Sequence, residues 1–513
     1  MRAYRRVMFV VTVASLIAAS AAAAEPEEKL ESENAELKAE LKVLRSQLRD
    51  ANRRLDALES RLGVAPSTIR SEMAGEAGRG SPGAATEPGT AASSGSTGRA
   101  QLGQSGPALP VQSPPIMGAP ASLAAPKPET WSPTQPLTLF SSPRAYMNIS
   151  FDALIDSGWS TTPNVMSLQV GDHDPNQRGF SLPNEEIFLD GAVDPYFTGA
   201  ANLVYKLDEN NETAVELEEA YLTTSSLPWN LQVKVGQFFT EFGRLNQQHP
   251  HAWDFVDQPL VNNRMFGPDG LRNPGARVSW LLPTSFYSEL LVTVMDPQGE
   301  TAFSFLNTEE ELFGRPPVER NVRNIGDLLY VPRYVASLDL TESQTIVAGV
   351  SAAFGPNSSG STLRTEIYGG DLYWKWKPAW QSGGFPFVSW QTEAMGRRYE
   401  AGAATTGEAP DLVQLPGENL YDWGFYSQIL YGFTPRWVAG IRGEWVSGDR
   451  GAFRPDENRS DRFRISPDLT FYPTEFSKIR LQYNFDHGQQ VGTQSSVWLQ
   501  TEFLLGSHAA HKF

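Results

Sequence analysis

The sequence predicts an all-β transmembrane barrel of about sixteen antiparallel strands, preceded by an N-terminal α-helical coiled coil and a disordered linker. Three observations lead to this prediction. Short segments between Tyr146 and Leu505 alternate apolar with polar residues, the connections between them are alternately short and long, and aromatic residues fall on the apolar face. Alternation at a period of two is typical of a strand with one apolar and one polar face.

The alternation is clearest in three segments near the C-terminus. Between Trp437 and Trp445, the charged residues Arg442 and Glu444 lie among apolar neighbours. The segments 478–485 and 497–503 repeat the pattern, with charges and amides confined to one face. We therefore expect each segment to form a strand with a polar inner face and an apolar outer face.

A soluble β-sandwich also alternates, but the positions of the aromatic residues distinguish the two folds. Trp437 and Trp445 share the apolar face. At about 3.3 Å per residue and a tilt near 40°, they lie roughly 20 Å apart along the barrel axis. This spacing is typical of two aromatic girdles that border a lipid-facing band.

The connections provide independent support. In outer-membrane barrels the short turns face the periplasm and the long loops face the exterior. Short connections are expected at 194–196, 225–230, 283–285, 341–343, 434–435 and 473–475, and long ones at about 159–184, 239–273, 296–327, 401–419 and 448–461.

The composition excludes several classes of protein. The 513-residue chain has no cysteine, which excludes thiolate metal sites, disulfides and a lipidated N-terminal cysteine. Its formal net charge of −17 argues against nucleic-acid binding, which needs a basic surface. No segment after residue 24 has the roughly 20 apolar residues of a spanning helix. The mean hydropathy of −0.34 fits a barrel, because only half of each strand faces lipid.

The N-terminal part divides into three segments. Residues 1–24 are interpreted as a signal peptide with a basic start, an apolar run and an Ala-x-Ala cleavage site before Glu25; the alternative is an uncleaved anchor helix. Residues 25–62 are predicted to form a periplasmic coiled coil. Residues 63–137, rich in Pro, Gly, Ala and Ser, are predicted to be a disordered linker, and 138–513 to be the barrel.

The coiled-coil prediction rests on a heptad repeat with matched charges. The g and following e′ positions are opposite in charge at Glu33/Lys38, Glu40/Arg45 and Arg54/Glu59, which favours parallel pairing over a single amphipathic helix. Leucine-on-leucine packing leaves dimer and trimer open. The a and d positions are Leu30, Asn34, Leu37, Leu41, Leu44, Leu48, Ala51, Leu55, Leu58 and Leu62.

Two stretches resemble known outer-membrane proteins. Leu217-Glu-Glu-Ala-Tyr-Leu and Val235-Gly-Gln-Phe-Phe-Thr-Glu-Phe-Gly243 resemble the phosphate-selective porin O and P family. The resemblance covers about 140–513 and implies a trimeric barrel of sixteen strands, often with an N-terminal coiled coil. The stretches 249–255 and 506–513, which contain four histidines, look like a subgroup linked to metals. A TonB-dependent receptor matches poorly, because it has 22 strands and a plug.

The resemblance implies that the loop at 239–273 folds inward and narrows the pore; the alternative is a surface flap. Its constriction residues would be Arg244, His249, His251, Asp254 and Arg264. His249 and His251 are weak metal candidates that Asp254 or Glu241 could complete, and no metal or cofactor is assigned. The predicted pore-lining residues are Arg277, Arg333, Arg397, Arg442, Glu444, Arg464 and Arg480.

Arginine rings select anions. The alternative, which the sequence favours equally, is that the arginines pair with inward carboxylates such as Glu216, Glu218, Asp371 and Glu393. The prediction is thus an outer-membrane porin for passive diffusion of small hydrophilic solutes or ions, with an anion preference as one outcome. Alternatives are a tether to the cell wall through the coiled coil, and metal-related uptake. Expected partners are outer-membrane lipid, two sister subunits and peptidoglycan, but not nucleic acid. An enzyme is not expected, because no Ser/His/Asp spacing stands out.

Overall fold

The structure is a computed structural model that describes residues 137–192, 194–208, 210–307, 311–407, 412–453 and 459–506. The predicted signal peptide, coiled coil and almost all of the predicted linker lie outside these ranges. The same is true of His508, His511 and Phe513 at the C-terminus. Among the described residues, no helix combines the length and the apolar character needed to cross a membrane.

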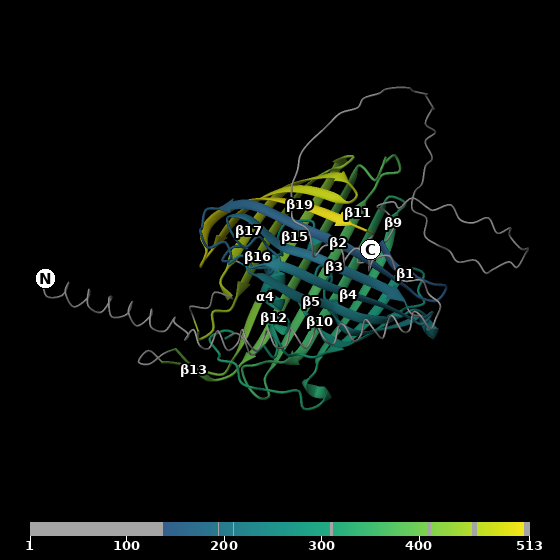
Figure 1. The fold of residues 1–513 in the computed structure, drawn as a ribbon. Helices are drawn as coiled ribbons and strands as arrows, with labels where there is room; N and C mark the ends of the chain where they lie inside the picture. Colours follow the sequence, from purple (N-terminus) through teal and green to yellow (C-terminus); the bar gives the residue numbers. More distant parts are fainter. Residues whose placement is uncertain are drawn as a thin grey trace, which may run out of the picture. The chain divides into compact units, whose positions relative to one another are not determined.

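Sixteen of the described strands form one closed antiparallel barrel, as the sequence predicts (Figure 1). Each strand pairs with its neighbours in chain order, and β19 pairs with β2 to close the ring. The strands are β2(Tyr146–Ser160), β3(Gly179–Ala192), β4(Phe197–Leu207), β5(Thr213–Thr224), β6(Leu231–Phe239), β7(Arg272–Leu281), β8(Tyr287–Met295), β9(Leu329–Thr341), β10(Gln344–Pro356), β11(Arg364–Trp376), β12(Phe387–Ala401), β15(Glu418–Thr434), β16(Trp437–Gly448), β17(Arg462–Thr474), β18(Ser477–Gly488) and β19(Gly492–Leu505).

A further short strand, β1(Leu137–Ser141), completes the seam of the barrel. It pairs with residues 146–149 of β2, whereas β19 pairs with residues 151–160 of the same strand. The opposite edge of β2 is occupied by β3. The two ends of the described chain therefore share one edge of β2, which leaves fewer backbone groups of that strand without a partner.

The outer face of the barrel is apolar and banded. Aliphatic side chains such as Ile441, Leu481 and Leu499 are exposed near the middle of their strands. Exposed aromatic residues lie toward both strand ends. At the rim of the long loops these are Trp159, Phe180, Tyr368, Tyr421, Trp423, Phe463 and Phe485, and at the rim of the short turns Tyr146, Tyr196, Phe197, Tyr287, Phe433, Trp437 and Phe503.

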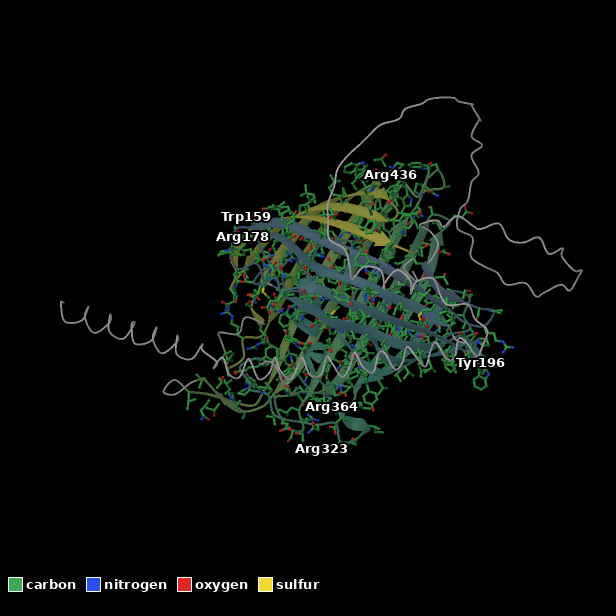
Figure 2. All side chains as sticks on the ribbon, in the orientation of Figure 1. Trp159, Arg178, Tyr196, Arg323, Arg364 and Arg436 are labelled. Carbon is green, nitrogen blue, oxygen red and sulfur yellow. The ribbon has the colours of Figure 1, made fainter. Side chains whose placement is uncertain are left out.

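Long and short connections lie at opposite rims, as predicted. In Figure 2, Arg178 and Arg323 mark the rim of the long loops, and Tyr196 and Arg436 mark the rim of the short turns. Three connections at the long-loop rim, 208–212, 357–363 and 489–491, are short. One connection at the other rim, 377–386, is longer than its neighbours. Successive connections still alternate between the two rims, but the length of a connection does not by itself show at which rim it lies.

The connections between the barrel strands carry the remaining elements. The connection between β12 and β15 contains a hairpin of β13(Ala404–Thr406) and β14(Val413–Leu415). The connection between β6 and β7 holds η2(Pro250–Ala252) and the helix α4(Leu260–Phe266). Three single 3₁₀ turns are η1(Pro228–Asn230), which lies in a short turn, η3(Glu300–Ala302) and η4(Ile325–Asp327).

Candidate functional site

Residues 240–271, which we call the inner loop, fold into the barrel and cross to the opposite wall. Their backbone amides donate to side chains of distant strands. Leu245 N donates to Glu393 Oε1 on β12 at 2.8 Å, and Val256 N donates to Gln482 Oε1 on β18 at 2.7 Å. In return, Arg480 Nη2 donates to Trp253 O at 2.8 Å. Buried backbone groups need such partners, so the loop is held at several points across the interior.

Asp257 is the most heavily bonded residue of the inner loop. Its carboxylate is fully buried and accepts from Arg442, from Arg464 Nη1 at 2.8 Å and from Asn484 Nδ2 at 2.7 Å. Burial alone would raise the pKa of the Asp257 carboxyl, but the two guanidinium groups outweigh burial and hold that pKa well below its usual range. Asp257 therefore stays charged and ties the loop to β16, β17 and β18.

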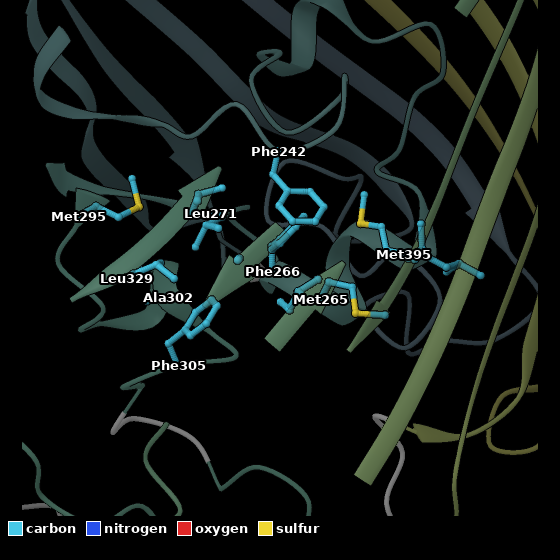
Figure 3. Close-up of a cluster of buried hydrophobic side chains, with 14 of the residues drawn as sticks. Phe242, Met265, Phe266, Leu271, Met295, Ala302, Phe305, Leu329 and Met395 are labelled. Carbon is cyan, nitrogen blue, oxygen red and sulfur yellow. The ribbon is translucent and has the colours of Figure 1, made fainter. Parts of the chain in front are cut away.

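A cluster of buried apolar side chains fills part of the interior (Figure 3). Phe242 and Phe266 of the inner loop meet edge to face, with ring centroids 5.0 Å apart. They pack with inward-facing residues of the wall, including Met395 and Tyr426. The alternation in the sequence predicts a polar inner face, and this prediction was wrong for these positions. They are apolar because they face the buried loop and not water.

Two glycines of the porin-like motif permit this packing. Gly236 has a φ of +141°, and a Cβ there would lie 2.2 Å from the carbonyl oxygen of Ala220 on β5. Gly243 has a φ of +62°, and a Cβ there would lie 2.0 Å from Glu393 Oε2. Both positions favour glycine because its backbone reaches positive φ without steric cost. The motif thus has a structural role at the point where β6 leads into the inner loop.

Two adjoining cavities remain between the inner loop and the wall, toward the rim of the short turns. Their volumes are about 590 Å³ and 860 Å³. Gln232, Glu241, Gln247 and Arg277 line both cavities, so the Glu241–Arg277 ion pair marks their junction. Charged residues of both signs line the larger cavity, among them Arg244, Glu289, Arg333, Asp371, Lys478 and Glu502.

The predicted pore-lining residues all lie on the inner face, where each is buried. Arg333 forms a bidentate pair with Asp371, and Arg397 does so with Asp422. Arg480 instead donates to Gln500 Oε1 at 3.0 Å, and its Nε lies 4.0 Å from Asp468 Oδ2. The remaining arginines also pair with carboxylates: Arg277 with Glu241, Arg442 with Asp257 and Glu444, and Arg464 with Asp257 and Asp486.

The predicted constriction residues separate into different environments. Arg244 faces the larger cavity, where it bonds Gln391 and lies 4.1 Å from the centroid of the Tyr373 ring. Asp254 accepts from Gln428 Nε2 at 2.8 Å. Arg264 points toward the rim of the long loops and donates to the carbonyl of Ser460. Of these three side chains, Arg244 and Asp254 line the larger cavity and Arg264 does not.

His249 and His251 lie among carboxylates that the sequence analysis did not connect with them. Of the two acidic residues that could have completed a site with these histidines, Glu241 instead pairs with Arg277 and Lys234, and Asp254 bonds Gln428. His249 Nδ1 instead lies 2.8 Å from Glu218 Oε2, and His251 Nδ1 lies 3.1 Å from Glu186 Oε1. Burial would lower the pKa of both imidazoles, but Glu186 and its neighbours outweigh burial and raise it.

A β-bulge in β5 brings two consecutive glutamates into this cluster. Asn202 of β4 is opposite Glu219, and Leu203 is opposite Leu217, so Glu218 is the extra residue. Glu218 and Glu219 are therefore both buried on the inner face. The sequence does carry a signal for this bulge. Exposed apolar residues fall at odd positions up to Leu217 and at an even position by Leu222, so the alternation changes phase between them.

The chain was compared with known families and proteins. No protein-family model matches it. It is 32% identical over 362 residues to an uncharacterized protein of Aquifex aeolicus (strain VF5), and the match covers 66% of this chain and 71% of that protein. The chain belongs to the family of that protein. This membership brings no assigned activity with it.

Solved structures of outer-membrane channels are similar at low scores. The DcaP channel of Acinetobacter baumannii has a TM-score of 0.45 and 11% identity, over 71% of this chain and 99% of that chain. An anion-selective porin from Comamonas acidovorans has a TM-score of 0.44 and 7% identity, over 70% of this chain and 100% of that chain. OmpF of Salmonella typhi has a TM-score of 0.44 and 11% identity, over 72% of this chain and 100% of that chain. Scores and identities this low say nothing about what passes through the present barrel.

Proposed function

We propose that the protein is an outer-membrane porin through which small hydrophilic solutes or ions diffuse passively, with the inner loop as its constriction. The observation that carries this proposal is the closed barrel with an apolar outer face and a charged, partly hollow interior. A soluble protein buries its apolar residues and exposes its charges, and this barrel does the reverse.

The outer face supports insertion in a bilayer. A closed ring of strands pairs its backbone groups without leaving a free edge, which is a condition for crossing a membrane with β-structure. The aliphatic band and the two aromatic belts meet the second condition, because aromatic residues favour the two membrane interfaces. The long loops would then face the exterior and the short turns the periplasm.

The inner loop supports a narrow pathway. It occupies the interior next to the two cavities, so a solute that enters from the short-turn rim meets charged residues of both signs, among them the Glu241–Arg277 pair. Because most inward arginines are paired with carboxylates, their charges are largely compensated at short range. We therefore expect a weak preference between anions and cations, in place of the strong anion preference of an unpaired arginine ladder.

Electrical recording on planar bilayers tests the proposal. The refolded full chain should give discrete conductance steps, and its reversal potential under a KCl gradient should lie near zero. Added phosphate should change the current little. A correctly folded barrel that gives no conductance would contradict the porin function, whereas a reversal potential close to that of a pure anion channel would contradict the paired-arginine account and leave the pore intact.

We further propose a homotrimer, and its support is the heptad repeat between Leu30 and Leu62 together with the porin-like motif. The mass of the detergent-solubilised protein, measured by light scattering, should equal three chains. A variant without 25–137 tells apart assembly through the coiled coil and assembly through the barrel. The same variant tests the tether hypothesis, because it should lose binding to sedimented peptidoglycan while retaining its conductance.

A further inference from the structure

Three of the chain's six histidines and three glutamates gather on the inner face of β3, β4 and β5. His249 and His251 reach this wall from the inner loop, and His173 reaches it from the connection between β2 and β3. His173 Nε2 lies 3.4 Å from Glu218 Oε1. All six side chains are buried. Charged groups are rarely buried in such number unless they are paired or coordinate a metal.

From this geometry we propose that His249, Glu218 and Glu186 form a binding site for a divalent transition metal ion such as Zn²⁺. The ligand atoms of these three residues lie within 4.8 Å of one another. His249 Nδ1 is 2.8 Å from Glu218 Oε2 and 3.7 Å from Glu186 Oε2. Tetrahedral zinc with bonds of about 2.0–2.2 Å places its ligands roughly 3.3–3.6 Å apart, so the spacing fits with small shifts.

The side-chain amide of Asn202 lies between the three ligand atoms. Its amide nitrogen lies 2.8 Å from Glu218 Oε2, 3.1 Å from Glu186 Oε2 and 3.1 Å from His249 Nδ1. The three ligand atoms thus converge on one position, which the amide occupies. The amide oxygen has no hydrogen-bond partner among the described residues. A metal ion at this position would displace the amide nitrogen, and rotation of the Asn202 side chain would then present the oxygen as the fourth ligand.

The outer contacts of the ligands are those of a supported metal site. His249 Nε2 lies 3.0 Å from Glu219 Oε2, so a histidine bound through Nδ1 would be oriented by a carboxylate. Glu186 Oε1 accepts from Asn184 Nδ2 at 2.7 Å. The bulge in β5 is what provides both Glu218 as ligand and Glu219 as support, and bulges are frequent where a strand re-aims a functional side chain.

A neighbouring buried acidic side chain adds to the carboxyl groups of this wall. Asp152 of β2 is directly opposite Glu186 in the β2–β3 ladder. Its side chain is fully buried, and neither of its oxygens has a hydrogen-bond partner among the described residues. Protonation of the histidines is the competing way to neutralise the negative charge of these buried carboxylates. A bound metal would instead join the inner loop to β3 and β5, and this holds whether or not the barrel conducts.

The test is calorimetric titration of Zn²⁺ into the refolded, untagged full chain, with Co²⁺ absorption as a second readout. The background variant His508→Ala/His511→Ala removes the two histidines of the C-terminal tail. We expect one Zn²⁺ per chain in this background and a Co²⁺ spectrum of tetrahedral type. Zn²⁺ should also raise the thermal unfolding midpoint.

Two ligand variants and one matched control decide the assignment. His249→Ala and Glu218→Gln should each weaken Zn²⁺ binding by more than the about 10–100-fold that loss of a supporting residue causes. His487→Ala should leave it unchanged, because His487 is exposed and bonds only Thr493 among the contacts of the described chain. His249→Ala alters the loop and not a strand, so it tests the site even if Glu218→Gln does not fold.

Absence of stoichiometric Zn²⁺ binding by the folded background variant would overturn the proposal. Binding that survives both ligand variants would also overturn it. In either case, protonated histidines and not a metal ion would neutralise the negative charge of the buried glutamates.

Discussion

At the scale of single residues, Asp257 organises the interior. Five donors from four elements converge on one buried carboxylate, and they come from Gln169, Arg442, Arg464, Gln482 and Asn484. Charge-assisted hydrogen bonds are about twice as strong as neutral ones, and they are stronger again where water is excluded. The inner loop is therefore fixed at its midpoint and not only at its two ends.

Replacing Asp257 should release the loop. Asp257→Ala leaves Arg442 without one of its two carboxylates and Arg464 with Asp486 alone, and breaking a buried ion pair costs about 3–5 kcal/mol. We expect a lower free energy of unfolding in urea and faster proteolysis within the inner loop. Glu342→Gln, in an exposed short turn, is the matched control and should change neither. Unchanged stability of Asp257→Ala would show that the ion pairs do not hold the loop.

The pH dependence of stability should reflect Asp174. Burial, and then the charge of Asp257, raise the pKa of Asp174 from 3.8 to about 7. A folded state with the raised pKa binds the proton more tightly, so this contribution to stability is complete below about pH 3.8 and lost as the pH rises through about 7. The unfolding midpoint should fall from pH 5 to pH 8, and it should fall less in Asp174→Asn. Parallel curves for the two proteins would contradict this assignment.

At the scale of elements, the bulge in β5 changes the register of an otherwise regular strand. Without it, Glu218 and Glu219 would face opposite sides of the wall. Deleting Glu218 should restore plain alternation, so the barrel should still fold, as measured by its heat-modifiable migration in SDS gels. Deleting Ala201 from the partner strand turns the rest of β4 over and should prevent folding. If both deletions behave alike, the bulge is not the feature that sets the faces of β5.

The strands could be predicted from sequence, but the partners of the inner loop could not. Arg442, Glu444 and Arg480 face inward as expected, because alternation is a local property that a short segment reveals. His249 and its neighbour His251 meet partners that are 30 and 65 residues away, and no local pattern encodes such a pairing. Inward apolar residues such as Met395 and Tyr426 follow from the buried loop, which the alternation did not show.

At the scale of the whole molecule, the described residues form a closed barrel whose interior is partly filled by the inner loop. An apolar cluster and an ion-paired network hold that loop, and cavities remain on the side of the short turns. Any solute that crosses the barrel must therefore pass the loop or displace it. The coiled coil, the trimer and the absence of enzyme activity stay predictions, because their tests lie outside the described barrel.

Single-channel conductance of a loop variant tests the central claim most directly. Replacing residues 245–268 with a short Gly-Ser linker should increase the conductance several-fold over that of the parent, because the constriction is removed. Deleting the hairpin 404–415 at the rim should leave the conductance unchanged. Equal conductance of the loop variant and the parent, with both barrels folded by circular dichroism, would show that the inner loop does not limit the pore.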